Sequence, residues 1–390
     1  MSRDLILVAI SLFTWGTGEG MFYFFQPLYL QEFGADPVKI GGILGAVGLA
    51  MTLSFLPAGY LSDRFGRLPL IRIAWIIGMA ATGLMALANS LPIFVAGMII
   101  YGATSFVTVP LNSYTTAARG RMSVGRTITL VSSSFNLGFI IGPLLGGWLS
   151  ARSGLQVNFQ IAFFIFFFSS IFVFLIRPQP VEKISTDEKS GGIRSLITPR
   201  YVQFLILAFF ITLGLYLPQP LTQNYMQNER GLNLVQIGQL ISVRSTGVVA
   251  LNLVLGQINA RWGSLLAQGC VALFTLFILK GSSYPVYLVG YFLMGGYMTA
   301  RLLIIAQART LMQSSQMGRA YGLLETVTAT ALVLGAPLAG YIYKIDPEFI
   351  YSTSIILILF GVGANLVFSP IRRKDLKRFE EKERATWKTS

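Results

Sequence analysis

Histidine is missing from the 390-residue chain, and cysteine occurs once, at Cys270. The absence of histidine excludes the usual zinc ligands, a Ser-His catalytic pair and histidine as a proton carrier. A single cysteine allows no disulfide within the chain and no cysteine-based metal site. No Gly-Lys dipeptide occurs, so a phosphate-binding loop of the usual kind is excluded. We therefore expect no cofactor, no bound metal, no ATP-driven pump and no enzymatic activity.

Charged residues are also scarce, at 12% of the chain, whereas soluble domains carry about 25%. Hydrophobic residues make up 54%, and phenylalanine alone supplies 29 positions. The net charge of +14 comes from lysines and arginines that lie mostly in short loops and the tail, where they orient a membrane protein. We expect no nucleic-acid partner.

Apolar segments of about 20 residues, the length that spans a bilayer, recur along the whole chain. They predict an all-α membrane protein with twelve transmembrane helices in two six-helix bundles related by a pseudo-two-fold axis. The expected spans are residues 5–30, 38–62, 69–89, 91–117, 125–150, 156–176, 200–226, 233–259, 264–281, 284–308, 319–343 and 350–369. The expected domains are an N-terminal bundle (1–176), a cytoplasmic linker (177–199), a C-terminal bundle (200–370) and a basic tail (371–390).

Lysine and arginine predict the orientation. With both termini in the cytoplasm, 23 of them fall in inside segments and 5 in outside segments. This bias follows the positive-inside rule and supports an even number of spans. We expect a multi-pass protein of the cell membrane, monomeric and in contact with lipids. The basic tail either touches anionic headgroups or is an ordinary solvated end.

The two halves repeat each other in sequence. Gln26-Pro27-Leu28 in the first span corresponds to Gln219-Pro220-Leu221 in the seventh, and Gly125-Arg126 corresponds to Gly318-Arg319. Because both copies start and end inside, they are parallel repeats, an arrangement that places a substrate site near the midplane between the halves.

The segment between the second and third spans, residues 59–67, reads Gly-Tyr-Leu-Ser-Asp-Arg-Phe-Gly-Arg. It resembles the loop signature of the major facilitator superfamily. The resemblance implies a twelve-helix transporter in which this loop latches the cytoplasmic side. The implied latch residues are Gly59, Asp63, Arg64, Gly66 and Arg67.

The fifth span carries a second motif, similar to one in the superfamily's drug–proton antiporters. Small residues let helix backbones approach, and proline bends the helix, so the motif suits a sliding interface between the halves. Ordinary small-residue packing is the alternative. The predicted hinge or interface residues are Gly138, Gly142, Pro143, Gly146 and Gly147.

Four ionisable residues fall well within the spans: Glu19, Arg244, Arg301 and Glu325. Each costs about 2.5–3.5 kcal/mol on insertion scales, so all four are functional candidates. Their depths, at about 1.5 Å per residue, predict a pair between Arg301 and Glu325. We expect Glu19 and Arg244 to face each other or a substrate.

Aromatic and amide side chains surround these charges in the sequence. Trp15, Tyr23 and Gln26 share a helical face with Glu19, and an acid beside aromatic rings can bind a cation or exchange a proton for a substrate. Plain packing is the alternative for each aromatic residue. The further candidates for substrate binding or proton coupling are Tyr216, Gln219, Gln223, Tyr297 and Tyr321.

Two functions stay open at this point. The first is proton-coupled efflux of small amphiphilic or drug-like compounds by alternating access, with Glu19 carrying the proton or meeting a cationic substrate. The second is proton-linked symport of an organic anion, a carboxylate or phosphate held by Arg244 and Arg301. Sodium is the alternative coupling ion in either case. A channel or a receptor is less favoured, because unlike halves joined by an ionic latch suit rocking.

Overall fold

The computed structural model describes residues 2–120, 122–179, 198–308, 311 and 317–368. In this part of the chain all regular structure is helical. Twelve helices or helix pairs are long and apolar enough to cross a membrane. The prediction of an all-α protein with twelve spans is therefore confirmed. The linker residues 180–197 and the tail from 369 lie outside the described residues.

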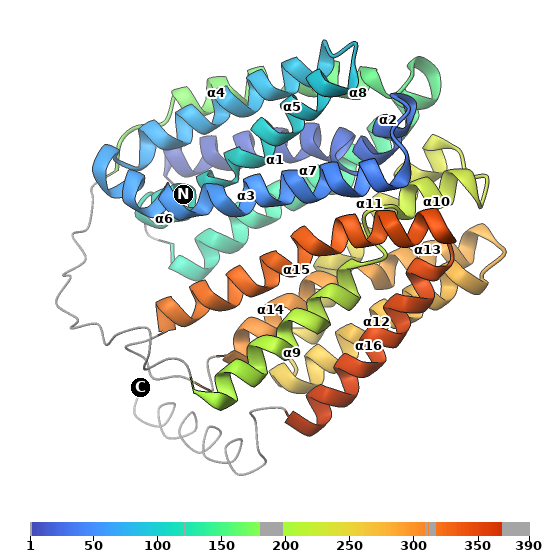
Figure 1. Cartoon of the computed structure of the whole chain (residues 1–390). Helices are drawn as coiled ribbons and strands as arrows, with labels where there is room; N and C mark the ends of the chain where they lie inside the picture. Colours follow the sequence, from blue (N-terminus) through green and yellow to red (C-terminus); the bar gives the residue numbers. More distant parts are fainter. Residues whose placement is uncertain (1, 121, 180–197, 309–310, 312–316, 369–390) are drawn as a thin grey trace.

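The spans form two bundles, one from each half of the chain (Figure 1). The first bundle contains α1 (Arg3–Phe22), the 3₁₀ turn η1 (Tyr23–Phe25), α2 (Gln26–Glu32), α3 (Pro37–Phe65), α4 (Arg67–Ala86), α5 (Leu91–Ala103), the 3₁₀ turn η2 (Thr104–Val107), α6 (Thr108–Ala117), α7 (Val124–Ser153) and α8 (Gln156–Phe174). The second contains α9 (Pro199–Tyr216), α10 (Thr222–Asn228), α11 (Leu234–Leu255), α12 (Ala260–Lys280), α13 (Tyr284–Met294), α14 (Gly296–Ala308), α15 (Met317–Ile345) and α16 (Phe349–Phe368).

The first and fourth spans of each bundle are interrupted, which the apolar pattern does not reveal. In the first span, η1 separates α1 from α2, and Pro27 stands in the first turn of α2. In the seventh, Pro218 and Pro220 stand in the break between α9 and α10. Proline cannot donate the backbone hydrogen bond of a helix interior, so helices end near it. The prediction that Gln26 shares a continuous helical face with Glu19 is therefore wrong.

The bundles touch along two equivalent helix pairs, α3 with α15 and α7 with α11. A Cβ atom added to Gly41 of α3 would lie 3.1 Å from the Cα of Gly340 in α15. A Cβ atom on Gly238 of α11 would likewise lie 3.1 Å from the Cα of Gly147 in α7. Gly238 stands 197 residues after Gly41, so the two crossings lie at corresponding places in the two halves of the chain.

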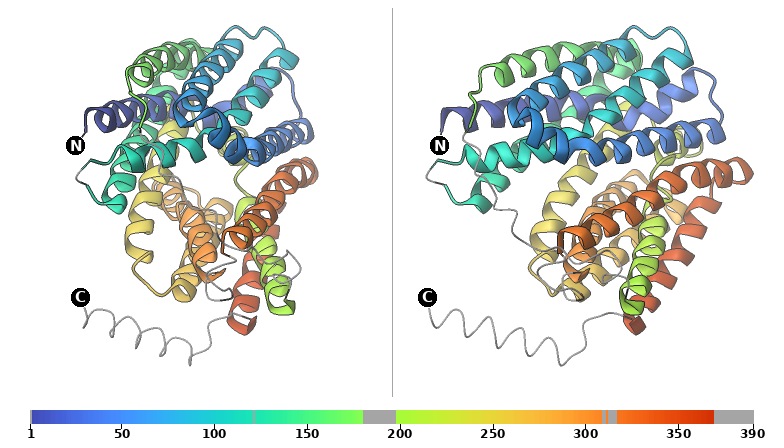
Figure 2. Two further views of the ribbon diagram at one scale, coloured as in Figure 1. Left: turned by 90° about the vertical axis from the view of Figure 1, so that its left-hand side faces the viewer. Right: turned by 60° about the vertical axis from the view of Figure 1, so that its left-hand side comes forward.

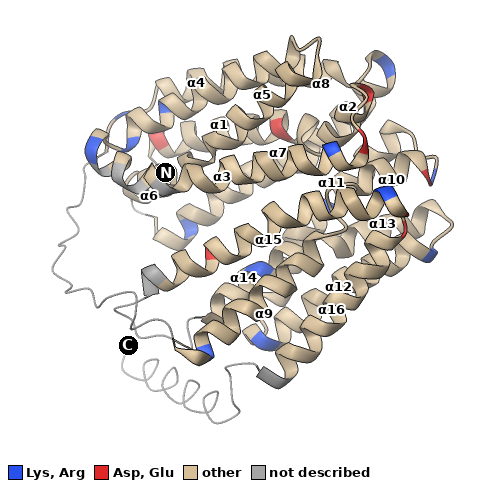
Figure 3. Ribbon diagram, viewed as in Figure 1, with Lys and Arg blue, Asp and Glu red and all other residues tan. Residues whose placement is uncertain are grey.

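These crossings lie near α2 and α10, which we call the closed side. From there the ribbons of α3 and α15 separate toward the side where α1 begins and α16 ends, which we call the open side (Figures 1 and 2). Figure 3 shows most lysines and arginines at the helix ends and few charges in the middle of either bundle.

Polar contacts join the two bundles on the closed side. Asn224 donates from Nδ2 to Gln31 Oε1 over 2.7 Å and to the carbonyl oxygen of Pro27 over 3.1 Å. Lys344 Nζ lies 3.6 Å from Asp36 Oδ2. Asp36 also caps α3, since its side chain accepts from the backbone N–H of Lys39 over 2.8 Å. That hydrogen bond, together with Lys344, lowers the pKa of the Asp36 carboxyl.

Candidate substrate and coupling site between the bundles

Glu19 lies in the last turn of α1, among aromatic side chains of the first bundle. Its carboxyl group is hydrogen-bonded to the side chains of Tyr101 and Trp15. Trp15 Nε1 also lies 3.2 Å from the Tyr101 hydroxyl, and its ring stacks on Phe166 with centroids 3.8 Å apart. Among the described residues no lysine or arginine lies within 4 Å of the carboxylate. Glu19 is thus an acid held by neutral polar groups.

Arg244 of α11 is a buried cation at the contact between the bundles. The residue is 8% exposed. Its Nη2 donates to Gln219 Oε1 over 3.1 Å, and its Cζ lies 4.6 Å from the ring centroid of Phe24 in the first bundle. Its Nε is buried without a hydrogen-bond partner. The guanidinium therefore spans both bundles and is only partly satisfied.

Glu19 and Arg244 do not form an ion pair. Tyr23 interacts electrostatically with both residues. The other tyrosines that interact electrostatically with Arg244 are Tyr297 and Tyr291. Tyr23 is 41% exposed although it lies near the middle of a span. Its ring packs against Phe24 and against Phe139 of α7, with centroids 5.2 Å and 6.3 Å apart. That Glu19 and Arg244 face each other or a substrate stays a prediction.

Arg301 and Glu325 form the ion pair that their depths predict. Arg301 Nη2 in α14 donates to Glu325 Oε2 in α15 over 2.6 Å. Both side chains are partly accessible, 29% for Arg301 and 44% for Glu325. The pairing follows because α14 runs toward the open side and α15 away from it, which brings the two residues to one level. The second bundle thereby neutralises Arg301, one of the two arginines that lie well within its spans.

The remaining predicted binding residues divide into two groups. Tyr216 and Tyr297 have ring centroids 6.3 Å apart, Tyr297 interacts electrostatically with Arg244, and Gln219 accepts a hydrogen bond from the guanidinium. In contrast, Gln26 and Gln223 are buried at the starts of α2 and α10 on the closed side. Tyr321 is half-buried one turn before Glu325.

The predicted latch lies at the turn between α3 and α4. Gly66 adopts a φ of +84°, a conformation that favours glycine, and so permits the sharp turn. Arg67 donates from Nη1 to the carbonyl oxygen of Ser113 in α6 over 3.3 Å, and Arg64 lies over the Phe65 ring. Gly59 and Asp63 belong to the last two turns of α3. The contact of Arg67 stays within the first bundle.

The glycine motif of α7 contacts two different neighbours. A Cβ on Gly138, Gly142 or Gly146 would run into the backbone of α1, so these three glycines pack within the first bundle and not between the halves. Pro143 and Gly147 face Gly238 of α11 across the bundle contact. The predicted interface role therefore fits these two residues alone. Sequence spacing identifies small residues, but it does not say which helix lies opposite.

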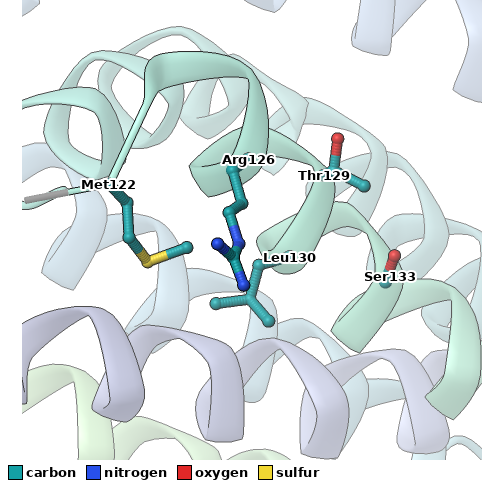
Figure 4. A pocket seen from close by; sticks show the side chains of 5 residues that line it. All are labelled: Met122, Arg126, Thr129, Leu130 and Ser133. Carbon is teal, nitrogen blue, oxygen red and sulfur yellow. The ribbon is translucent and has the colours of Figure 1, made fainter. Parts of the chain in front are cut away.

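A pocket of about 710 Å³ opens at the start of α7, on the open side (Figure 4). In Figure 4 the side chains of Arg126 and Leu130 lie beside Met122, while Thr129 and Ser133 follow one another along the helix. These five residues line the pocket, and none of them was a predicted binding residue. Two residues further along α7, Phe135 contacts α1 at Gly16, one turn before Glu19.

Sequence reasoning missed three aromatic residues of this region, Phe24, Tyr101 and Phe139. The Phe24 ring covers Arg244 and lies 5.6 Å from Phe139 of α7, and Tyr101 of α5 reaches Glu19. With 29 phenylalanines in the chain, no single one stands out. Only the packing of distant helices brings these rings to the charges.

Twelve spans in two bundles, with Arg244 buried where the bundles meet, are the architecture of a major facilitator transporter. The family model of the Major Facilitator Superfamily matches residues 8–300 and 204–389, and the chain belongs to this family. The family and fold are those of transporters of small molecules, not of enzymes.

Several of the chain's relatives are drug-resistance proteins. It is 26% identical over 355 residues to the tetracycline resistance protein, class B, of Escherichia coli. This alignment covers 84% of this chain and 85% of that protein. It is 22% identical over 384 residues to multidrug resistance protein 2 of Bacillus subtilis (strain 168), covering 93% and 94%.

Among solved structures, the chain resembles the crystal structure of the nucleoside transporter NupG. The TM-score is 0.73 with 13% sequence identity, over 94% of this chain and 98% of that one. At this identity the likeness supports the fold alone.

Proposed function

We propose that the protein is a secondary active transporter that exports small amphiphilic compounds by alternating access, coupled to protons. The observation that carries the coupling is Glu19, an acid in the middle of the membrane without a basic partner among the described residues. A carboxylate there costs about 2.5–3.5 kcal/mol, and binding a proton removes this penalty. The resistance proteins among the relatives support the direction.

The orientation belongs to the same proposal. The bias of lysine and arginine puts both termini in the cytoplasm of a cell, so the open side faces inward and the closed side outward. In this state the space beside α7 takes up solutes from the cytoplasm. Outward release then requires the crossings and hydrogen bonds of the closed side to separate. The chain works as a monomer, because one copy supplies both bundles.

The alternative, symport of an organic anion held by two arginines, has less support. Arg301 is neutralised by Glu325 at 2.6 Å, so it is not free for a substrate anion. Arg244 alone keeps that capacity.

The test is proton release from everted membrane vesicles. Tetracycline, added to energised vesicles in sodium-free buffer, should dissipate the pH gradient reported by a fluorescent amine. Glu19→Gln should reduce this response at least tenfold, because an amide cannot carry a proton. The matched control is Glu32→Gln, at the end of α2, where the acid is exposed. An undiminished response in Glu19→Gln would overturn the role of Glu19.

A further inference from the structure

Arg244 has far fewer partners than a buried guanidinium requires. Arginine carries five N–H donors and stays charged in proteins. Within the described part of the chain, the guanidinium donates a hydrogen bond to one neutral amide oxygen, that of Gln219, and its Nε is buried without a partner. No carboxylate of the described residues lies within 4 Å. A buried charge without a counter-ion strongly destabilises a protein unless another group pairs with it.

The other charges of the midplane already have partners. Arg301 is neutralised by Glu325 at 2.6 Å, and Glu19 is held by Tyr101 and Trp15. Tyr23 interacts electrostatically with both Glu19 and Arg244 but offers no second charge. Neither Glu325 nor Glu19 therefore pairs with Arg244, so its guanidinium can accept an anion from outside the chain.

The surroundings of Arg244 are aromatic on both bundles. The Phe24 ring lies 4.6 Å from its Cζ, and Phe24 packs against Phe139 with centroids 5.6 Å apart. On the second bundle lie Tyr216 and Tyr297, whose rings are 6.3 Å apart. The Tyr297 hydroxyl is buried and has no hydrogen-bond partner, so it offers a second donor near the cation. Tyr23, which interacts electrostatically with Arg244, is 41% exposed.

We infer that Arg244 anchors the anionic group of the transported compound, and that the substrate class is therefore aromatic or amphiphilic monoanions, carboxylates above all. This inference rests on the proposed transport function and specifies its substrate. The planar guanidinium matches a carboxylate with two parallel hydrogen bonds, one of which uses the unpaired Nε. The flat body of the substrate then stacks on the aromatic rings, as aromatic side chains stack on each other.

The inference predicts a ligand preference that the wild-type protein reveals without any mutation. Purified full-length protein in lipid nanodiscs is titrated with 2-naphthoate, with 2-naphthamide and with 2-naphthylmethylammonium, which share one ring system. We expect the carboxylate to bind at least tenfold more tightly than the amide and the cation. Equal binding of the three compounds would overturn the inference.

Two variants then locate the binding group. Arg244→Gln should weaken 2-naphthoate binding at least tenfold and leave 2-naphthamide unchanged, while Arg244→Lys, which keeps the charge but loses the fork, should fall between. The control is Arg152→Gln, which removes the same charge at the end of α7, where Arg152 stacks on Trp148. Unchanged binding of the carboxylate by Arg244→Gln would contradict the inference.

The result of the binding experiment can be distinguished from the result of the test of the proposed function. Binding in nanodiscs needs no proton gradient, so selective binding of the carboxylate supports the inference even if coupling at Glu19 fails. Conversely, proton-coupled export of tetracycline together with equal binding of all three naphthyl compounds would keep the proposed function and overturn the anionic class.

Discussion

At the residue scale, Arg301 and Glu325 make the closest ion pair among the described residues, with 2.6 Å between nitrogen and oxygen. Glu325→Gln leaves Arg301 charged within the membrane without its counter-ion. Because both side chains are partly accessible, the free energy of unfolding should fall by about 1–3 kcal/mol, less than for a fully buried pair. The measurement is the thermal unfolding midpoint of the protein in detergent.

Two further variants separate pairing from side-chain loss. The double variant Arg301→Gln/Glu325→Gln should recover part of the stability, since no uncompensated charge remains. Glu348→Gln is the matched control, because its oxygen lies 3.8 Å from Arg230 and the pair is weak. If Glu325→Gln unfolds at the wild-type temperature, the pair contributes no stability.

The sequence predicted this pair and placed Trp15 beside Glu19, but it did not predict Tyr101 there. Depth along a span follows from the rise of a helix, so residues on adjacent antiparallel spans can be matched. The rotation of a helix about its own axis cannot be predicted in this way, because a helix that is apolar on all sides has no amphipathic stripe that shows which face points inward. Tyr101 was therefore not predicted as a neighbour of Glu19. Tyr23 was predicted beside Glu19, but its interaction with Arg244 was not.

At the element scale, α1 and α7 are joined by a ladder of glycines. Gly138, Gly142 and Gly146 recur every four residues on one face of α7 and meet the α1 backbone. A Cβ on Gly142 would lie 2.8 Å from the Cα of Gly20, so Gly142→Ala must push the two helices apart. Overpacking of this kind destabilises by about 1–3 kcal/mol, which should appear as a lower unfolding midpoint.

The control for this prediction is a glycine with free space around it. A Cβ on Gly42 of α3 meets nothing within 4 Å, and Gly42→Ala gains helix propensity of about 1 kcal/mol. Its unfolding midpoint should equal or exceed that of the wild type. Equal midpoints for both variants would show that the close approach of α1 and α7 is not needed.

The elements themselves were largely predictable, because length and hydropathy define a span. The interruptions in the first and fourth spans of each bundle were not, although Pro27, Pro218 and Pro220 are visible in the sequence. Proline is tolerated in membrane helices when neighbours satisfy the freed backbone groups. Whether it ends a helix therefore depends on packing, as at η1.

At the scale of the whole molecule, the closed side decides which face of the membrane the site reaches. The pKa of the Asp36 carboxyl is lower in the folded protein than its ordinary value of about 3.9. The stabilisation of the closed side by ionised Asp36 is therefore complete above the ordinary pKa and is lost as the pH falls through the lowered pKa of the folded protein. The pair with Lys344 therefore persists throughout the neutral range. Opening must come from separation of the helices rather than from protonation of Asp36.

Cross-linking the closed side tests whether transport requires it to open. Gln31 and Asn224 face each other across the bundles, with 2.7 Å between Oε1 and Nδ2, and the chain's one cysteine can be removed as Cys270→Ser. In that background, oxidation of Gln31→Cys/Asn224→Cys should join α2 to α10 and abolish transport, and a reductant should restore it. Either cysteine alone should be insensitive to oxidant. Because alternating access exposes the site to one side at a time, transport that continues after complete cross-linking would mean that release does not pass between α2 and α10.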